Sequence, residues 1–146
     1  MIAVEVCFVE AAGTRSVDYT VFVCRLIERG YERGERALVL CPDRARAEAL
    51  DRSLWSFDPD SFVPHGLIDQ ASAKTPVLLV PPEHRFSAEG GPVVYNLRPA
   101  AVAEAGRVIE PIPPDEPGKA AARERWRPYQ RAGHSPRLER IEVSTA

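Results

Sequence analysis

Short, almost uninterrupted apolar runs alternate with segments of helical periodicity, and this alternation most limits the folds open to the chain. Ile2–Val9 and Arg36–Cys41 are rich in apolar and β-branched residues, as is typical of strands. The near-continuous hydrophobicity of the second run suits a strand buried on both faces. Between them, Val17–Ile27 has a helical apolar period, with Ser16 as a suitable N-cap and Gly30 as a stop signal.

The same alternation continues to the end of the chain. Asp43 can cap a second helix that ends near Trp55, a short helix is predicted over Pro99–Ala105, and a final helix over Lys119–Gly133. Further strands are predicted at Pro76–Val80, Pro92–Asn96 and Arg107–Glu110, before a proline-rich connector at Pro111–Pro117. Because crossover helices cover both faces of a parallel sheet, this order predicts an α/β protein, a three-layer sandwich with a mostly parallel sheet.

Length and charge limit the organisation and the partners. With 146 residues, the chain is long enough for one domain with a core and too short for two comfortable ones. We expect a single α/β domain over residues 1–133 and an extended or poorly ordered tail over residues 134–146. The formal net charge of −2 argues against a general nucleic-acid binder, since duplex binding rests on a large positive surface. Any role with nucleic acid is therefore expected to be indirect.

The cysteines and the amino-terminal sequence bear on the compartment. Each cysteine lies in an apolar run without metal-site spacing, so burial as a small hydrophobe is predicted for Cys7, Cys24 and Cys41. Free thiols suit a reducing cytoplasm. The sequence starts without a basic segment and a long apolar core, and no run approaches the ~20 residues of a membrane-spanning helix. We expect a cytoplasmic protein that makes no membrane contact.

The sequence lacks the common motifs of catalytic sites. No GxxxxGK[ST] or GxGxxG follows a strand, so a nucleotide site is not predicted. Ser56, Ser61 and His65 lack the GxSxG elbow of a nucleophile, and Asp58 and Asp60 suit Asx-type bonding to the backbone in a turn. No metal-site spacing relates the three histidines, His65, His84 and His134. We therefore predict no catalytic site, no metal and no cofactor.

The segment Lys119–Gly133, KAAARERWRPYQRAG, combines basic and aromatic side chains in a chain that is otherwise acidic. Helical geometry places Lys119, Arg123 and Arg127 in one row, with Trp126 and Gln130 alongside. Guanidinium groups can grip carboxylates bidentately, and an indole can anchor an apolar group, so the row suits an acidic peptide. The pattern is equally compatible with a solvated amphipathic helix.

Aromatic residues are concentrated around an Asp-Pro-Asp turn in the segment LDRSLWSFDPDSFVPH at residues 50–65. Trp and Phe in such a segment either fill the core or form an exposed anchor for a partner. The residues alone favour the core for Trp55, Phe57 and Phe62.

This segment, together with VLLV at 77–80, IEPIP at 109–113 and AARERWRPYQRAG at 121–133, resembles the chi subunit family of bacterial DNA polymerase III. The similarity extends from the first strand to Gly133. It implies a Rossmann-like fold without a phosphate-binding loop, and a non-catalytic adaptor of the polymerase III holoenzyme that acts in DNA replication as a clamp-loader accessory.

The resemblance also implies two partner surfaces. One receives the acidic, Phe-ended C-terminal tail of single-stranded DNA-binding protein, and the matching residues are Ile112, Arg123, Trp126 and Arg127, with Arg125 and Tyr129 as neighbours. The other holds the psi subunit, or an equivalent clamp-loader partner, through residues that match Trp55 and Phe62. Pro128 departs from the family pattern. Within a helix it removes one backbone hydrogen bond and disfavours α geometry at Arg127, at a cost of roughly 3 kcal/mol unless the helix bends or ends there, so the position of Arg127 is less well defined than that of Arg123.

Two other functions remain open at this point. A small α/β enzyme that uses a nucleotide or phosphate ester would have a pocket at the carboxyl ends of the strands. A direct single-stranded DNA binder would use Trp126, Tyr129 and the nearby arginines as a stacking platform.

Overall fold

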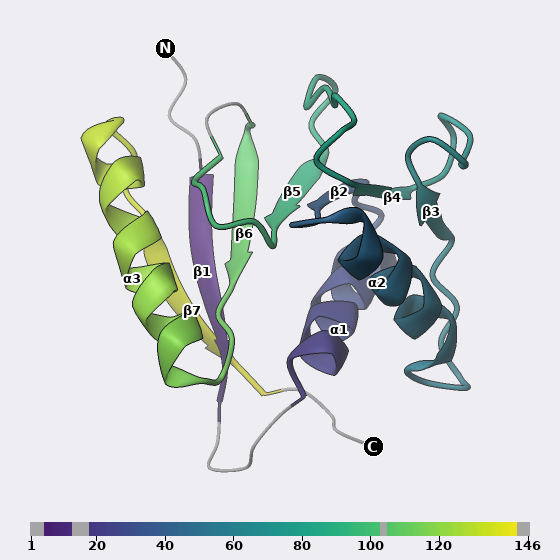
Figure 1. The fold of residues 1–146 in the computed structure, drawn as a ribbon, viewed down its shortest axis with the longest axis horizontal. Helices are drawn as coiled ribbons and strands as arrows, with labels where there is room; N and C mark the ends of the chain where they lie inside the picture. Colours follow the sequence, from purple (N-terminus) through teal and green to yellow (C-terminus); the bar gives the residue numbers. More distant parts are fainter. Residues whose placement is uncertain (1–4, 13–17, 103–104, 143–146) are drawn as a thin grey trace.

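The computed structural model describes residues 5–12, 18–102 and 105–142. Three helices and seven strands lie in these ranges, and Figure 1 labels them. In chain order they are β1 (Glu5–Ala11), α1 (Tyr19–Glu32), β2 (Ala37–Leu40), α2 (Arg44–Ser56), β3 (His65–Leu67), β4 (Val77–Val80), β5 (Val93–Asn96), β6 (Arg107–Pro111), α3 (Glu116–Arg131) and β7 (Arg137–Ile141).

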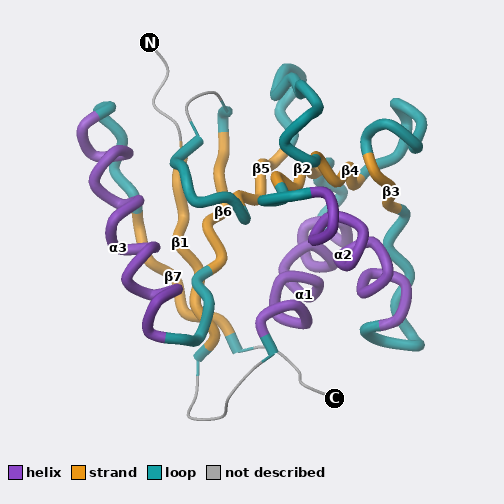
Figure 2. The backbone as a smooth tube through the Cα atoms, in the orientation of Figure 1, coloured by secondary structure: helices purple, strands orange, loops and turns teal. Residues whose placement is uncertain are grey.

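The strands form one sheet in the order β3-β4-β2-β5-β6-β1-β7, and every pair is parallel. In Figure 2, α1 and α2 lie together, whereas α3 lies apart from them beside β1 and β7. Alternate residues of β1 belong to different cores: Cys7 and Val9 pack with α1 and α2, and Val6 and Phe8 pack with α3. The helices therefore cover opposite faces of the sheet, and the predicted three-layer α/β sandwich with a parallel sheet is confirmed.

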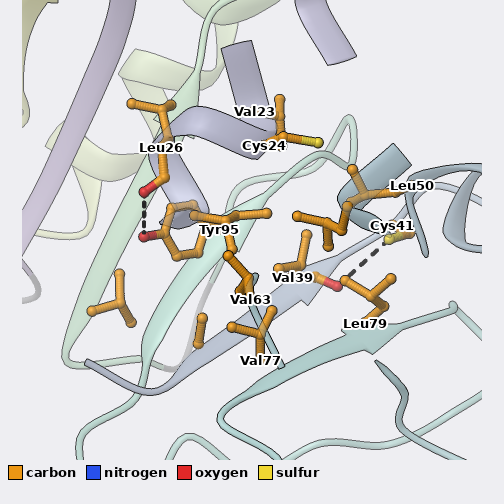
Figure 3. Close-up of a cluster of buried hydrophobic side chains, with 14 of the residues drawn as sticks. Val23, Cys24, Leu26, Val39, Cys41, Leu50, Val63, Val77, Leu79 and Tyr95 are labelled. Atoms are coloured by element: carbon orange, nitrogen blue, oxygen red, sulfur yellow. Dashed lines mark hydrogen bonds between the residues drawn. The ribbon is translucent and has the colours of Figure 1, made fainter. Parts of the chain in front are cut away.

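The core under α1 and α2 is almost wholly apolar (Figure 3). All three cysteines are buried and free, as predicted, and burial raises the pKa of the Cys24 and Cys41 thiols to about 12. Tyr95 is the polar exception, and its hydroxyl donates to the carbonyl of Leu26 at 3.3 Å, which satisfies the buried O–H.

The predicted ends of the first helix are wrong. Ser16 lies outside the described residues, and the observed N-cap of α1 is Asp18, whose side chain accepts from the Val21 N–H. At the other end, α1 runs past Gly30 to Glu32, and Gly34 adopts the left-handed conformation with φ 79°. Gly30 is instead required by close packing, because a Cβ built there would lie 2.5 Å from the Tyr95 hydroxyl.

The predicted helix over Pro99–Ala105 is also wrong for residues 99–102 and 105, which are not helical; residues 103 and 104 lie outside the described residues. Local backbone groups bind side chains instead. The Asn96 side-chain amide donates to the carbonyl of Ala100 at 2.9 Å, and the N–H of Val102 donates to the Tyr129 hydroxyl at 3.0 Å. These tertiary partners replace the bonds that a helix would have formed.

Two of the observed strands were not predicted from the sequence. His65–Leu67 forms the short edge strand β3, and Arg137–Ile141 forms β7, which pairs with β1 from Cys7↔Arg137 to Ala11↔Ile141. The region after Gly133 was expected to be an extended or poorly ordered tail; instead the sheet continues there through Ile141. Its sequence RLERI lacks the apolar character of a buried strand because four of its five residues are exposed.

We expect Gly30→Ala to destabilise the protein by about 1–3 kcal/mol through overpacking against Tyr95, although alanine normally favours a helix. Urea unfolding would measure the free energy of unfolding. In a Tyr95→Phe background, which lacks the clashing hydroxyl, the same substitution should cost clearly less. Equal costs in the two backgrounds would contradict the packing explanation.

Candidate functional site

The residues at both ends of α3 and in its interior favour a helix. Asp115 is the N-cap and accepts from the Gly118 N–H at 2.7 Å, Pro117 lies in the first turn, and three alanines follow. Gly133, with φ 89°, comes just after the helix. The helix does not end at Pro128, since α3 continues to Arg131. Arg127 therefore keeps a helical position.

A surface cavity of about 490 Å³, here called the α3 groove, lies between α3 and the strands β1 and β7. The predicted row contributes five of its lining residues. The full lining is Phe8, Glu10, Ile112, Lys119, Ala122, Arg123, Trp126, Arg127, Gln130 and Leu138.

Trp126 forms the aromatic wall of the α3 groove. Its ring packs on the buried ring of Phe8, with centroids 4.9 Å apart and planes at 38°. Phe8 in turn meets Tyr129 edge-on at 6.0 Å. The carbon-rich floor includes Ile112, whose N–H donates to the carbonyl of Val9 at 2.8 Å. The groove therefore has a supported wall and an apolar floor that can accept an aromatic or aliphatic side chain.

Positive charge dominates the helical side of the groove. Among the described residues, neither Lys119 nor Arg123 has an acidic partner in an ion pair. Arg127 lies 3.9 Å from Glu124, but both side chains are largely exposed, so this pair holds Arg127 only weakly. Glu10 is the acidic group in the lining, and it pairs with Arg140. Two unpaired cations thus remain available to a carboxylate.

Arg125 and Tyr129, the expected neighbours of the peptide site, are not among the residues that line the groove. Tyr129 is buried, and its hydroxyl donates to Glu110 Oε2 at 2.6 Å. Arg125 Nε donates to Glu110 Oε1 at 2.9 Å with a mostly buried side chain. Both residues face the sheet and fasten α3 to β6.

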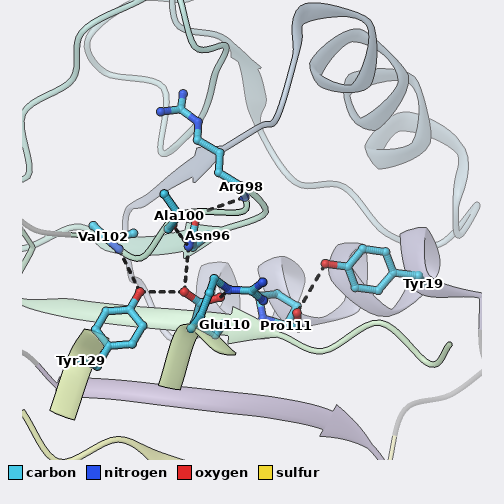
Figure 4. A network of polar contacts seen from close by, with 9 residues as sticks. Tyr19, Asn96, Arg98, Ala100, Val102, Glu110, Pro111 and Tyr129 are labelled. Carbon is cyan, nitrogen blue, oxygen red and sulfur yellow. Dashed lines mark hydrogen bonds and ion pairs between the residues drawn. The ribbon is translucent and has the colours of Figure 1, made fainter. Parts of the chain in front are cut away.

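The centre of this polar network is Glu110, whose side chain is fully buried (Figure 4). Besides Arg125 and Tyr129, it accepts from the Asn96 side-chain amide at 2.7 Å. Desolvation raises the pKa of Glu110, and the charge of Arg125 and the three hydrogen bonds oppose that rise. Burial likewise raises the pKa of Tyr129, and the neighbouring carboxylate adds to it. The carboxylate thus joins β5, β6 and α3 beneath the groove.

Four residues of this site were not predicted from the sequence. Three of them line the groove, Phe8, Glu10 and Leu138, and the fourth, Glu110, holds α3 in place. Glu110 gave a usable signal, because a glutamate inside an apolar strand must find partners when it is buried. Phe8 resembled any other core residue. Leu138 fell in the segment that was not expected to be a strand.

A second exposed feature lies on the other half of the protein. Trp55 and Phe62 are 57% and 66% exposed, with ring centroids 5.9 Å apart. The interpretation as core residues is therefore wrong for these two. The buried imidazole of His65 supports the indole at 4.8 Å, and carbonyl oxygens of Val63 and Asp51 lie 2.7 and 3.0 Å from its two ring nitrogens.

The other polar candidates have structural partners. Ser56 Oγ donates to the carbonyl of Arg52 at 3.1 Å, and the Asp60 N–H donates to Asp58 Oδ1 at 2.8 Å, the Asx-type bond that was predicted. Within the described ranges, no group of three or more acidic, histidine or cysteine side chains could hold a metal ion. No helix in those ranges is long and apolar enough to cross a membrane.

A second cavity, of about 710 Å³, lies near the carboxyl ends of β2 and β5, where Cys41 and Leu97 contribute to its lining. Ligands of open α/β sheets commonly bind at this edge. Its polar lining includes Arg46, Ser53 and Asp115, and Asp115 is already engaged as the cap of α3. The cavity agrees with one expectation of the enzyme alternative.

Taken together, these features define a small Rossmann-like α/β protein with a basic, aromatic-walled groove on its last helix. The family of the DNA polymerase III chi subunit, HolC, matches residues 5–137. DNA polymerase III subunit chi of Pseudomonas aeruginosa is 33% identical over 118 residues, 76% of this chain and 78% of the relative. The Escherichia coli subunit is 31% identical over 115 residues, again 76% and 78% of the two chains. The Haemophilus influenzae subunit is 26% identical over 121 residues, 81% and 84% of the two chains.

The chain therefore belongs to the DNA polymerase III chi subunit family. It is an accessory subunit of a replicative polymerase, as the sequence resemblance implied.

The raised pKa of Glu110 predicts a pH dependence of stability. A carboxyl group that keeps its proton more strongly in the folded state favours folding at low pH, and this contribution is lost as pH rises. The free energy of unfolding of the wild type should therefore fall relative to that of Glu110→Gln, starting near the unfolded pKa of about 4.3 and levelling off above the folded pKa. Urea unfolding of both proteins across this range would measure it; a constant or opposite difference would contradict the sign.

Proposed function

We propose that this chain is a non-catalytic adaptor that binds the acidic C-terminal tail of single-stranded DNA-binding protein. It links that protein to the clamp loader through psi or an equivalent partner. The observation that carries the proposal is the α3 groove, in which free cations border an apolar, aromatic-walled cavity.

Each part of the groove suits one part of such a tail. Trp126, packed against Phe8, and the nearby Ile112 would enclose the terminal aromatic side chain. Arg123 would pair with the terminal carboxylate or an upstream aspartate, and Arg127 would add a second positive contact. Arg125 and Tyr129 act indirectly, since their bonds to Glu110 keep α3 in place.

The same geometry is less suited to direct binding of single-stranded DNA. A stacking platform needs accessible rings, and Tyr129 is buried while Trp126 already packs one face against Phe8. The formal net charge of −2 argues against a general nucleic-acid binder, which rests on a large positive surface. A peptide is the better match.

The exposed pair Trp55 and Phe62 is the proposed contact for psi or its equivalent. Two adjacent aromatic rings with high exposure, braced by His65, resemble the anchors that dominate protein interfaces. The pair lies on and after α2, whereas the groove is built from α3 and the strands β1 and β7 on the opposite face. One chain could therefore hold both partners at once.

We expect saturable, micromolar binding of a fluorescent acidic peptide that ends in Ile-Pro-Phe, and weaker binding at higher salt because exposed charges are screened. Arg123→Ala should weaken binding about tenfold or more, as expected for a lost charge-assisted hydrogen bond. Arg131→Ala is the matched control, since Arg131 is an exposed cation of the same helix outside the groove. Fluorescence anisotropy would measure the affinity of the peptide for the wild type and for both variants.

Equal losses in the two variants would mean that overall charge, and not the groove, attracts the peptide. If the wild type does not bind at all, the adaptor proposal fails. Thermal stabilisation by a nucleotide in the same preparation would then favour the enzyme alternative through the cavity near Cys41 and Leu97.

The two proposed surfaces should be separable by mutation. Trp55→Ala with Phe62→Ala should abolish co-elution with a clamp loader reconstituted from the same genome, because both anchors are lost, while peptide affinity stays unchanged. Arg123→Ala should do the reverse. Size-exclusion chromatography and the anisotropy assay would test both; loss of both activities in one variant would contradict two independent surfaces.

A further inference from the structure

The sheet ends on one side at β7, and among the described strands none pairs with the outer edge of β7. The edge lies next to the α3 groove, since Leu138 of β7 lines that groove. An open edge offers backbone donors and acceptors to any extended chain that reaches it. Which backbone groups are free follows from the pairing with β1.

The N–H of Ala12 donates to the carbonyl of Ile141 at 2.8 Å, so the peptide groups of Ile141 face β1. Along a strand, the N–H and C=O of one residue point to the same edge, and the edge alternates from residue to residue. Glu139 therefore also faces β1, while the N–H and C=O of Leu138 and Arg140 face outward.

The side chains of the same two residues belong to the groove side of the sheet. Leu138 is in register with Phe8, and Arg140 is in register with Glu10, with which it forms an ion pair. Phe8 and Glu10 both line the groove. The same two residues of β7 therefore offer free backbone groups at the sheet edge and side chains on the groove side of the sheet.

We propose that an acidic peptide in the α3 groove adds to β7 as a further strand of the sheet, bonded to the backbone of Leu138 and Arg140. This inference rests on the proposed function and specifies how its partner is held. Charge favours an acidic occupant, because residues 119–140 carry a net charge of +5. In strand addition, backbone hydrogen bonds supply affinity and every second side chain of the peptide enters a pocket. The α3 groove lies on one face of the sheet and could receive those alternate side chains.

A backbone scan of the peptide tests this on the wild-type, full-length chain. Each residue of the acidic, Phe-ended peptide is N-methylated in turn, except its proline, which has no N–H; each methylation removes one N–H and keeps the side chain. Strand addition predicts a loss of about fivefold, the measure of one net hydrogen bond, at every second residue and little loss between them. Insensitivity at all positions would overturn the inference.

A matched pair of variants tests the protein side. Leu138→Ala shortens the side chain and keeps the outward N–H, whereas Leu138→Pro also removes that N–H, on an edge where proline is tolerated. Leu138→Pro should bind the peptide about fivefold more weakly than Leu138→Ala. Equal affinities would overturn the inference. If Leu138→Pro does not fold, the scan on the wild-type chain still decides.

The outcomes separate this inference from the function on which it rests. Binding that requires Arg123 but tolerates every N-methyl group would leave the adaptor proposal standing and overturn strand addition. Absence of wild-type binding would overturn both. Sedimentation would also show whether a second copy pairs at β7; a dimer that is lost in Leu138→Pro, together with an insensitive peptide, would assign the edge to self-association.

Discussion

The buried carboxylate of Glu110 is the contact on which the arrangement of the site depends. It is enclosed between β6 and α3 and satisfied by Arg125, Tyr129 and Asn96. A buried charge without partners would be strongly destabilising, so these three residues are held in place together. Because Arg125 and Tyr129 alternate along α3 with the groove residues, their attachment fixes the rotation of the helix and so the side that lines the groove.

The parallel sheet separates two surfaces that serve different partners in the proposed adaptor. Alternation along β1 sends Phe8 toward α3 and Cys7 toward α1, so each face of the sheet has its own core. The groove develops where α3 meets β1 and β7, and the exposed pair Trp55 and Phe62 follows α2. At the carboxyl ends of β2 and β5, Asp115 contributes to the lining of the second cavity and is also the N-cap of α3.

Local pattern was sufficient for most of the fold and for part of the site. Local sequence predicted the apolar strands β2, β4, β5 and β6 and the capped helix α2, because the apolar pattern of each segment itself indicates which residues are buried. The row of Lys119, Arg123 and Arg127 followed from helical geometry alone. Errors arose where a distant partner decided the outcome: Val102 bonds to Tyr129 instead of forming a helix, and Gly30 packs against Tyr95 instead of ending one.

The sequence by itself determined the fold class, the basic row and the family, because periodicity and motif are properties of neighbouring residues. Only the tertiary structure decided which residues of α3 face the groove, since Arg125 and Tyr129 turn inward to reach Glu110 from a distant strand. Only it made a strand of RLERI, whose exposed side chains carry no apolar signal and whose order comes from hydrogen bonds to β1. Backbone pairing between segments more than a hundred residues apart leaves no local trace in the chain.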